Sequence, residues 1–197
     1  LYALVALVNL GTTTAPETAW YGQLGDEVRI TLGQTAEIAE IRVFGGLYTG
    51  RITLLADDGT EYEYDQENGD MFRWKDIADG TSTTTSGFTL TVTTGQVWFN
   101  EIAFFDAEGN YISAEAEGDA ALLFDEPDEV PENLSYLNGM YFDELYHART
   151  AYEHLHGLSP YENSHPPLGK VFIMLGIAII GMNAFGWRII GTLFGIG

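Results

Sequence analysis

The residues of this chain with the greatest chemical potential lie between positions 141 and 170. An acidic pair, Asp143 and Glu144, stands near the start of this segment, and the motif His-Pro-Pro-Leu-Gly-Lys ends it. Residues 171–197 then form a long apolar run in which Arg188 is the one charged side chain. Because about 20 apolar residues can cross a bilayer, carboxylates, histidines and a lysine placed directly before such a run indicate catalysis at a membrane surface.

The apolar run predicts two helices instead of one. Residues 181–186, Gly-Met-Asn-Ala-Phe-Gly, are rich in turn-forming types. We therefore expect one helix over residues 167–181 and the start of another at Trp187, which together with Arg188 resembles an interfacial anchor. On this interpretation residues 167–197 hold a transmembrane helix and the start of the next.

Charge is spread very unevenly along the chain. There are 29 Asp and Glu residues against 8 Lys and Arg, which gives a net charge of −21, and the last acidic residue is Glu162. This excess argues against binding nucleic acid or anionic lipid by electrostatics, because both require clustered Lys and Arg. Arg188 in the connection after the first apolar helix favours a cytoplasmic position for that connection, with the acidic bulk outside. Cysteine is absent, so disulfides do not hold the fold.

Alternating apolar and polar residues predict that the chain is mainly β. The alternating runs are residues 27–32, 38–44, 51–56, 88–93 and 97–105. Glycine-rich turns separate them at short and regular spacing, which is typical of a sandwich of antiparallel sheets. We predict a jelly-roll-like β-sandwich over residues 11–115. The apolar residues 1–10 fit either the end of a membrane helix or a first buried strand.

Three motifs in this region resemble the galactose-binding-like, or discoidin-like, family. They are the Asn-Leu-Gly and Ala-Pro-Glu-Thr-Ala-Trp sequences within residues 9–20, a central Asp-Asp-Gly-Thr hairpin, and Phe-Asn-Glu-Ile-Ala-Phe-Phe-Asp near the end. The resemblance implies carbohydrate binding by loops at one end of the sandwich. The residues that this implies are Trp20, Tyr21, Trp74 and Asn100. The alternative is that these aromatic rings belong to the core, as most aromatic residues of a small sandwich do.

Residues 116–138 predict an extended acidic connector, because acidic residues and prolines dominate them. The next segment, residues 139–166, contains one short amphipathic helix over residues 142–156. Its apolar seam consists of Leu145, Ala148, Tyr152 and Leu155, and its other face carries Asp143, His147 and His154. Such a seam favours an interfacial helix at the membrane surface.

The order of motifs in residues 141–197 resembles the protein O-mannosyltransferase family of membrane glycosyltransferases. The motifs are the pair Asp143 and Glu144, a short helix followed by Gly157, the His-Pro-Pro-Leu-Gly-Lys sequence, and a Trp-Arg step that opens the next helix. The resemblance implies that the acidic pair lies in an exoplasmic loop. It also implies transfer of a mannose-like hexose from a polyprenyl-phosphate donor to a Ser or Thr hydroxyl.

The resemblance has a departure that bears on function. A sandwich stands where the family has a loop, which leaves the acceptor class open between a protein and a glycan. Because most lipid-binding helices of the family are missing from these 197 residues, we expect this stretch alone to be inactive. The resemblance also implies a multi-pass protein of the cell membrane, with the sandwich and the acidic pair on the exoplasmic side.

The acidic pair divides into two roles on this interpretation. A hydroxyl that attacks a sugar C1 must lose its proton, so we assign Asp143 as general base. Glu144 points elsewhere on a helix, so it positions the acceptor or orients Arg149 and the histidines, among them His147. The simpler alternative is that an acidic pair at a helix start only complements the helix dipole.

The leaving phosphate needs a cation more than it needs an acid. Lys170, at the start of an apolar helix, supplies that charge together with the helix N-terminus. His165 either contacts the phosphate or caps the helix. A lysine that merely extends to the membrane interface is the alternative.

We predict no resident cofactor and no metal site, and the use of a divalent metal stays open. Glu144 and His147 form one Glu-x-x-His step, but a second step that would complete a di-metal site is absent from the sequence. The predicted partners are the lipid-linked sugar, a protein or glycan acceptor and membrane lipid, and nucleic acid is excluded. The alternative function is a non-catalytic extracellular carbohydrate-binding sandwich tethered to the membrane. The His-Pro-Pro-Leu-Gly-Lys motif favours the enzyme, because a tether needs only apolar length and flanking charge.

Overall fold

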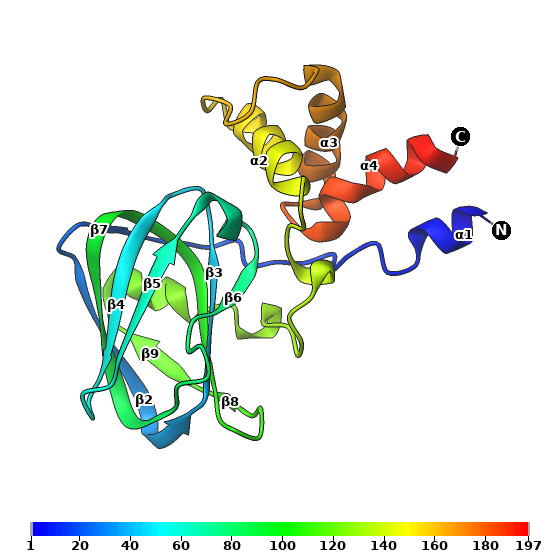
Figure 1. Cartoon of the computed structure of the whole chain (residues 1–197). Helices are drawn as coiled ribbons and strands as arrows, with labels where there is room; N and C mark the ends of the chain where they lie inside the picture. The colour runs from blue at the N-terminus through cyan, green and yellow to red at the C-terminus, as the bar shows by residue number, and fades with distance from the viewer. Residues whose placement is uncertain (1, 197) are drawn as a thin grey trace. The chain divides into compact units, whose positions relative to one another are not determined.

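A computed structural model describes residues 2–196 and divides the chain into two compact units. The β unit comprises Pro16–Val130, and the helical unit comprises the residues before and after it (Figure 1). The β unit consists mostly of antiparallel sheet, and helices follow it in the chain. In this form the prediction of a mainly β fold followed by helices is confirmed.

The β unit is built from two groups of antiparallel strands that share one long strand, β7. The strands are β1 (Trp20–Gln23), β2 (Glu27–Ile38), β3 (Glu40–Gly45), β4 (Gly50–Ala56), β5 (Glu61–Gln66), β6 (Trp74–Asp76), β7 (Thr83–Phe105), β8 (Tyr111–Ile112) and β9 (Ala114–Ala116). The first part of β7 lies in the order β5-β4-β7-β2-β9, and its second part pairs with β1, β3 and β8. β6 extends the second group by pairing with β3.

β7 corrects the prediction of two separate strands over residues 88–93 and 97–105. Gly95 adopts a φ of +66°, and the register against β4 shifts between Arg51 and Ile52. A glycine in the left-handed region accommodates such a bulge and bends the strand without ending it. The continuous strand therefore contributes to both groups (Figure 1).

The core of the β unit lies between the two strand groups. Phe88 and Phe104, from the two parts of β7, stack with ring centroids 4.9 Å apart, and both are fully buried. Alternate residues of β2 and β4, such as Ile30 and Leu54, complete the same cluster. The period-two pattern in the sequence therefore marks the buried faces correctly.

The acidic segment after β8 is more structured than an extended connector. It forms β9 and three 3-10 helices, Gly118–Leu123, Pro127–Glu129 and Tyr136–Asn138. A further 3-10 helix covers Asn68–Asp70. Ala120 and Leu123 are buried in the core of the β unit, and Phe124 stacks on Phe104 at 6.2 Å. The apolar run within this segment outweighs the acidic composition around it, because burial of apolar area stabilises the ordered state.

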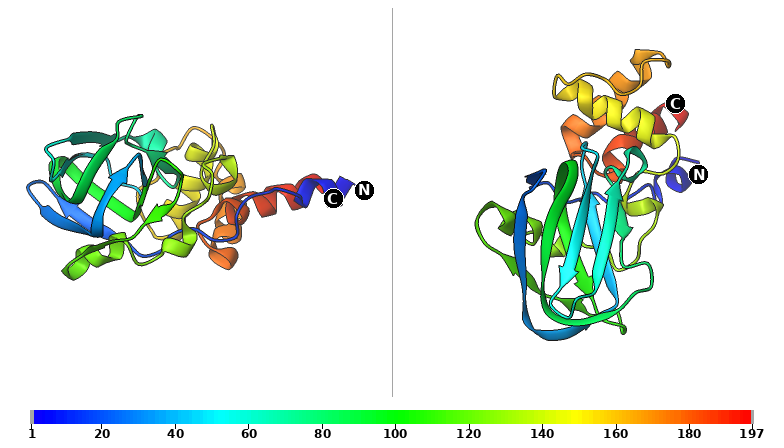
Figure 2. Two further views of the ribbon diagram at one scale, coloured as in Figure 1. Left: turned by 90° about the horizontal axis from the view of Figure 1, so that it is seen from below. Right: turned by 60° about the vertical axis from the view of Figure 1, so that its left-hand side comes forward.

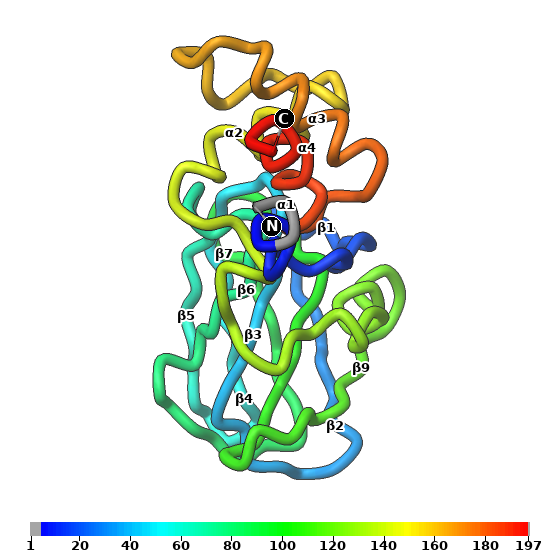
Figure 3. The backbone as a smooth tube through the Cα atoms, turned by 90° about the vertical axis from the view of Figure 1, so that its right-hand side faces the viewer, coloured from blue at the N-terminus to red at the C-terminus, as the bar shows by residue number. Residues whose placement is uncertain are grey.

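The helical unit contains α1 (Tyr2–Leu7), α2 (Glu144–Leu155), α3 (Pro167–Ile180) and α4 (Ala184–Ile196). The apolar N-terminal run is thus helical where it is described, and α1 lies beside α4 (Figures 2 and 3). α3 begins at Pro167, as the sequence predicts, because proline suits the first turn of a helix. α4 begins earlier than the predicted Trp187, because Asn183 Oδ1 accepts a hydrogen bond from the Gly186 N–H at 2.8 Å and so caps the helix.

Two features of these helices bear on the expected membrane contacts. Over residues 2–196 no helix combines the length and apolar character needed to cross a membrane; α3, the expected spanning helix, has 14 residues. Of the predicted apolar seam of α2, Ala148 is buried and Leu155 is exposed, and the interfacial position of this seam stays a prediction. Its buried residues are Ala148, Arg149, Thr150, Ala151 and Glu153. The buried polar residues of α2 form an ion pair and hydrogen bonds, and these offset the free-energy cost of removing them from water.

Candidate functional site

Glu144, in the first turn of α2, forms a two-pronged ion pair with Arg188 of α4. Arg188 Nε and Nη2 donate to the two Glu144 carboxylate oxygens at 2.5 and 2.6 Å. The same guanidinium donates to the carbonyl of Leu10 at 2.9 Å and to that of Gly139 at 3.3 Å. Arg188 therefore joins four segments of the helical unit, and the planar guanidinium suits this because it offers donors in several directions.

A groove of about 520 Å³ opens beside this ion pair. Its polar lining includes Asp143, Glu144, His147 and Arg188, and its remaining lining is mostly apolar. Asp143 is exposed, and within the described part of the chain its carboxylate accepts no hydrogen bond and forms no ion pair. The groove thus holds one unengaged carboxylate beside a neutralised pair, on an apolar wall. An apolar lining with a few converging polar groups is typical of small-molecule binding sites.

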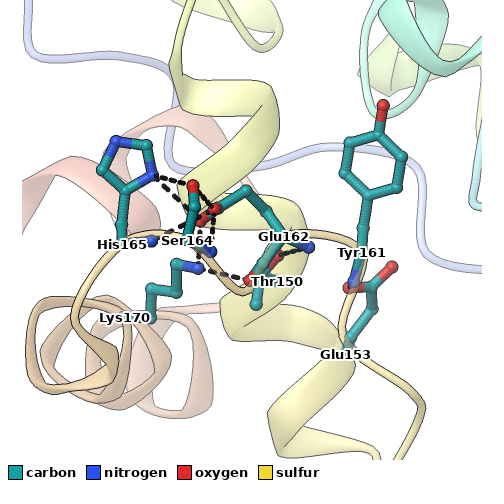
Figure 4. Close-up of polar contacts among 7 residues, drawn as sticks. All are labelled: Thr150, Glu153, Tyr161, Glu162, Ser164, His165 and Lys170. Carbon is teal, nitrogen blue, oxygen red and sulfur yellow. Dashed lines mark hydrogen bonds and ion pairs between the residues drawn. The ribbon is translucent and has the colours of Figure 1, made fainter.

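A second polar cluster surrounds Glu162, in the loop between α2 and α3 (Figure 4). Lys170 is 2% exposed, and its Nζ donates to the Glu162 carboxylate and, at 2.5 Å, to the Glu162 carbonyl. Ser164 donates to the same carboxylate through its N–H and its hydroxyl. The Lys170 ammonium and the Ser164 hydroxyl hold the pKa of Glu162 far below its usual range. Glu162 is therefore ionised at every physiological pH.

Two histidines complete this cluster. His165 Nδ1 lies 3.1 Å from Glu162 Oε2, and the His147 and His165 rings meet edge to face with centroids 4.9 Å apart. His147 also lines the groove that contains Asp143. This one side chain therefore connects the groove to the Glu162 cluster.

Arg149 and Glu153 hold the loop against α2. Arg149 Nε donates to Glu153 Oε1 at 2.8 Å, and the guanidinium lies 3.9 Å from the centroid of the Tyr161 ring. The Tyr161 N–H donates to Glu153 Oε2 at 2.6 Å, and the Glu162 N–H to the Thr150 hydroxyl at 3.3 Å (Figure 4). These contacts fix the position of Glu162, so Arg149 acts on the cluster through the loop.

The structure thus distributes the predicted catalytic residues over two neighbouring places in the helical unit. Asp143, Glu144 and His147 line the groove, whereas His165 and Lys170 gather around Glu162. Glu162 and Arg188 were not predicted as site residues. Each carried a signal, because Glu162 is the last acidic residue of the chain and Arg188 the single charge of the apolar run.

The residues proposed for carbohydrate binding lie in different environments of the β unit. Trp20 and Trp74 are buried at 7% and 4% exposure, and Asn100 is buried while its side-chain amide donates to the carbonyl of Thr18 at 2.8 Å. Burial withholds both indole faces from a sugar, whereas Tyr21 is 53% exposed. The carbohydrate platform stays a prediction, and Tyr21 is the exposed member of the four.

Tyr21 belongs to an exposed aromatic patch, which we define as Tyr21, Tyr48 and Trp98. Their ring centroids lie 5.2 to 6.1 Å apart. Gly46 allows this close packing, because a Cβ there would meet the Trp98 ring at 2.3 Å. Sequence reasoning identified one of these three rings, since Tyr48 and Trp98 come from segments far from Tyr21 in the chain.

One buried carboxylate of the β unit has an unusual environment. Glu101 is fully buried, and Asp125 and Glu126 place their carboxylate oxygens within 4.8 Å of it and of each other. Burial is the main cause that raises the pKa of Glu101 to about 8, although the Glu126 N–H donates to its carboxylate at 3.1 Å. Glu101 is therefore largely protonated at neutral pH.

Comparison with known proteins gives a partial match to one kind of enzyme. A stretch covering 28% of the chain is 41% identical over 61 residues to the polyprenol-phosphate-mannose–protein mannosyltransferase of Mycobacterium tuberculosis, and 36% identical over 61 residues to that of Mycolicibacterium smegmatis. The matched stretch spans 12% of the length of these relatives. No family model matches the chain, and no solved structure matches it significantly. The chain thus shows a partial, distant similarity to polyprenol-phosphate-mannose-dependent protein mannosyltransferases.

Proposed function

We propose that the helical unit is the catalytic-loop part of a membrane glycosyltransferase that transfers a mannose-like hexose from a polyprenyl-phosphate donor to a Ser or Thr hydroxyl of a protein. The observation that carries this proposal is the groove, in which the unengaged Asp143 carboxylate lies beside the Glu144–Arg188 pair and an apolar wall. The similarity to polyprenol-phosphate-mannose–protein mannosyltransferases supports it independently.

Asp143 is the general base of the proposed reaction. Its carboxylate takes the proton of the acceptor hydroxyl while the hydroxyl oxygen forms a bond to C1 of the sugar. The bond between C1 and the phosphate oxygen breaks, and the polyprenyl phosphate leaves with that electron pair. Glu144 keeps Arg188 in place at the groove, so its role is to position a cation and not to accept a proton.

Lys170 and His165 are the proposed partners of the donor phosphate. Lys170 is the fourth residue of α3, so its ammonium and the free N–H groups of the first turn favour an anion at the same end of the helix. In the structure the Lys170 ammonium is already paired with the Glu162 carboxylate. A donor phosphate therefore competes with the Glu162 carboxylate for this cation or adds to it.

Membrane attachment of the helical unit is part of the proposal. The support is the exposure of large apolar side chains on the helices, with Leu168 at 63%, Ile179 at 78% and Phe194 at 63%. Contact with lipid or with further apolar helices would remove this surface from water. We propose a multi-pass cell-membrane protein with the β unit and the Asp143 loop on the exoplasmic side.

The test is Asp143→Asn in the full-length membrane protein, because asparagine keeps the shape and removes the base. We expect transfer of radiolabelled mannose from polyprenyl-phosphate-mannose to a peptide to fall at least about 100-fold, the lower range for losing a general base. The matched control is Asp128→Asn, an exposed acid of the β unit, which should leave transfer unchanged. Transfer at the wild-type rate by Asp143→Asn protein of normal abundance would eliminate this mechanism.

The aromatic patch favours a second function, carbohydrate binding by the β unit. Two of its three rings, Tyr21 and Tyr48, are 53% and 40% exposed, and sugars stack on such faces. We expect Tyr21→Ala to weaken binding of a mannose-containing glycan at least about fivefold, with Tyr111→Ala as the control at a similarly exposed tyrosine elsewhere on the β unit. Equal binding by both variants in a glycan-array titration would remove the patch as a sugar site.

A further inference from the structure

His147, Glu162 and His165 bring three metal-ligating side chains together in the helical unit. One ligand atom from each lies within 4.8 Å of the other two, and His165 Nδ1 and Glu162 Oε2 are 3.1 Å apart. We propose that these three residues form a binding site for one divalent transition-metal ion, with Zn²⁺ as the ion of best fit.

The ligand chemistry selects the kind of metal. Two imidazoles and one carboxylate are a set that binds Zn²⁺ with a fourth position left for water or substrate. Calcium and magnesium prefer oxygen ligands throughout, so the histidines disfavour them. The exposed side chain of His165 and the part-buried His147 leave an entrance for the ion.

The distances require little movement to close around an ion. Ligand atoms about 2.1 Å from a tetrahedral Zn²⁺ are about 3.4 Å from one another. The 3.1 Å between His165 and Glu162 already agrees with this spacing, and the widest separation allowed by the cluster, 4.8 Å, exceeds it by about 1.4 Å. Rotation of side chains covers such a difference without a change in the backbone.

The backbone positions of the three ligands are fixed by separate contacts. His147 lies within α2, and the Arg149–Glu153–Tyr161 contacts hold the loop that carries Glu162. His165 directly precedes Pro166 and Pro167, and α3 begins at the second of these prolines. Because the supporting shell exists before an ion arrives, less conformational entropy is lost on binding than in an unstructured loop.

Lys170 competes with the metal ion for the Glu162 carboxylate. Its ammonium contacts the same carboxylate oxygen, Glu162 Oε2, that faces His165. A bound Zn²⁺ would replace Lys170 there, while Lys170 keeps its hydrogen bond to the Glu162 carbonyl. Metal binding then frees part of the Lys170 charge for an anion; this consequence, unlike the metal site itself, rests on the proposed glycosyltransferase function.

The experiment is titration of Zn²⁺ into the purified 197-residue chain by isothermal calorimetry, without donor or acceptor. We expect one site per chain in the wild type and affinity at least about tenfold lower in both His147→Ala and His165→Ala, the smallest loss typical even of an outer partner of a ligand. The matched control is His154→Ala, an exposed histidine on α2 outside the cluster, with wild-type affinity. Circular dichroism verifies that each variant keeps its helices.

Lys170→Met gives a result that a purely structural cluster would not produce. Removal of the competing ammonium should tighten Zn²⁺ binding several-fold, whereas loss of a merely structural lysine would leave it unchanged or weaken it. Co²⁺ in place of Zn²⁺ provides a second measurement, because its visible absorption reports the number of ligands and should change in His165→Ala protein.

Zn²⁺ affinity in His147→Ala and His165→Ala equal to that of the wild type would overturn the proposal. So would an absence of Zn²⁺ binding by wild-type protein at micromolar concentrations. Neither result depends on sugar transfer.

Discussion

The two units of this chain differ in how many of their ion pairs are shielded from water. In the β unit the pairs Arg29–Asp57 and Arg51–Asp65 lie on the surface, with about a third to a half of each side chain exposed, whereas Arg42–Glu40 is shielded at 8% and 28% exposure. The buried Glu101 of this unit lies among carboxylates and is neutralised by a proton. In the helical unit the ion pairs are withdrawn from water. They are Arg149–Glu153, Lys170–Glu162 and Arg188–Glu144, with side-chain exposures from 3% to 27%.

This difference in the shielding of ion pairs bears on where the functional site lies. Withdrawing an ion pair from water costs desolvation free energy, and apolar residues of similar volume often stabilise a fold as well or better. The β unit has a large apolar core and keeps the pairs Arg29–Asp57 and Arg51–Asp65 at the surface. The helical unit holds three shielded pairs, and one of them, Arg188–Glu144, lines the groove; a functional use of this charge is the hypothesis that the variants below test.

Glu101→Gln should produce the largest effect, because it removes the buried titrating carboxyl of the β unit. The pKa of Glu101 is raised from 4.5 to about 8 in the folded state. Because the folded-state pKa is raised, protonated Glu101 contributes its full stabilisation of the β unit below pH 4.5. This contribution is lost as the pH rises through 8. The wild-type β unit should therefore lose about 4 kcal/mol between these pH values.

The measurement is amide hydrogen exchange of β7, which reports the stability of the β unit separately from the helices. The Glu101→Gln variant should show a flat profile between pH 4.5 and 8 and should exceed the wild type at pH 8. An unchanged pH profile in the variant would show that another group, or a bound cation, controls this dependence.

Arg188→Met should destabilise the helical unit by about 3 kcal/mol, near the lower end for a buried pair because Glu144 remains about a quarter exposed. The variant leaves the Glu144 carboxylate without its cation and the carbonyls of Leu10 and Gly139 without a donor. Hydrogen exchange of α2 and α4 measures this loss. The double variant with Glu144→Gln should recover part of it, and a double variant as unstable as Arg188→Met would show that the lost carbonyl contacts dominate.

The parts of the fold that could be predicted from the sequence are those fixed by short-range patterns along the chain. Strand alternation located the buried faces of β2 and β4, and the proline pair located the start of α3 within the chain. These features depend on neighbouring residues and on backbone geometry. The continuous β7 was missed because Gly95 can either end a strand or bend it, and pairing with β4 decides between these outcomes.

The candidate site was predictable in composition but not in connectivity. The types at Asp143, His165 and Lys170 indicated chemistry, yet the partner of Glu144 lies 44 residues away in an apolar run. Helical periodicity predicted an apolar face for α2, whereas Arg149 and Glu153 are buried because each neutralises the other. Such pairs depend on tertiary packing, which overrides single-residue polarity.

Arg51→Met provides the smallest effect and the most direct test of the contrast between the units. Its pair with Asp65 has side-chain exposures of 45% and 52%, so solvent already screens the attraction. We expect no measurable change in the stability of the β unit, as judged from the exchange of β4 and β5 amides at low and high salt. The same arginine-to-methionine change at position 188 should cost measurably more. If the two substitutions cost the same, solvent access would not distinguish the ion pairs, and the shielded charges of the helical unit would no longer point to a functional site.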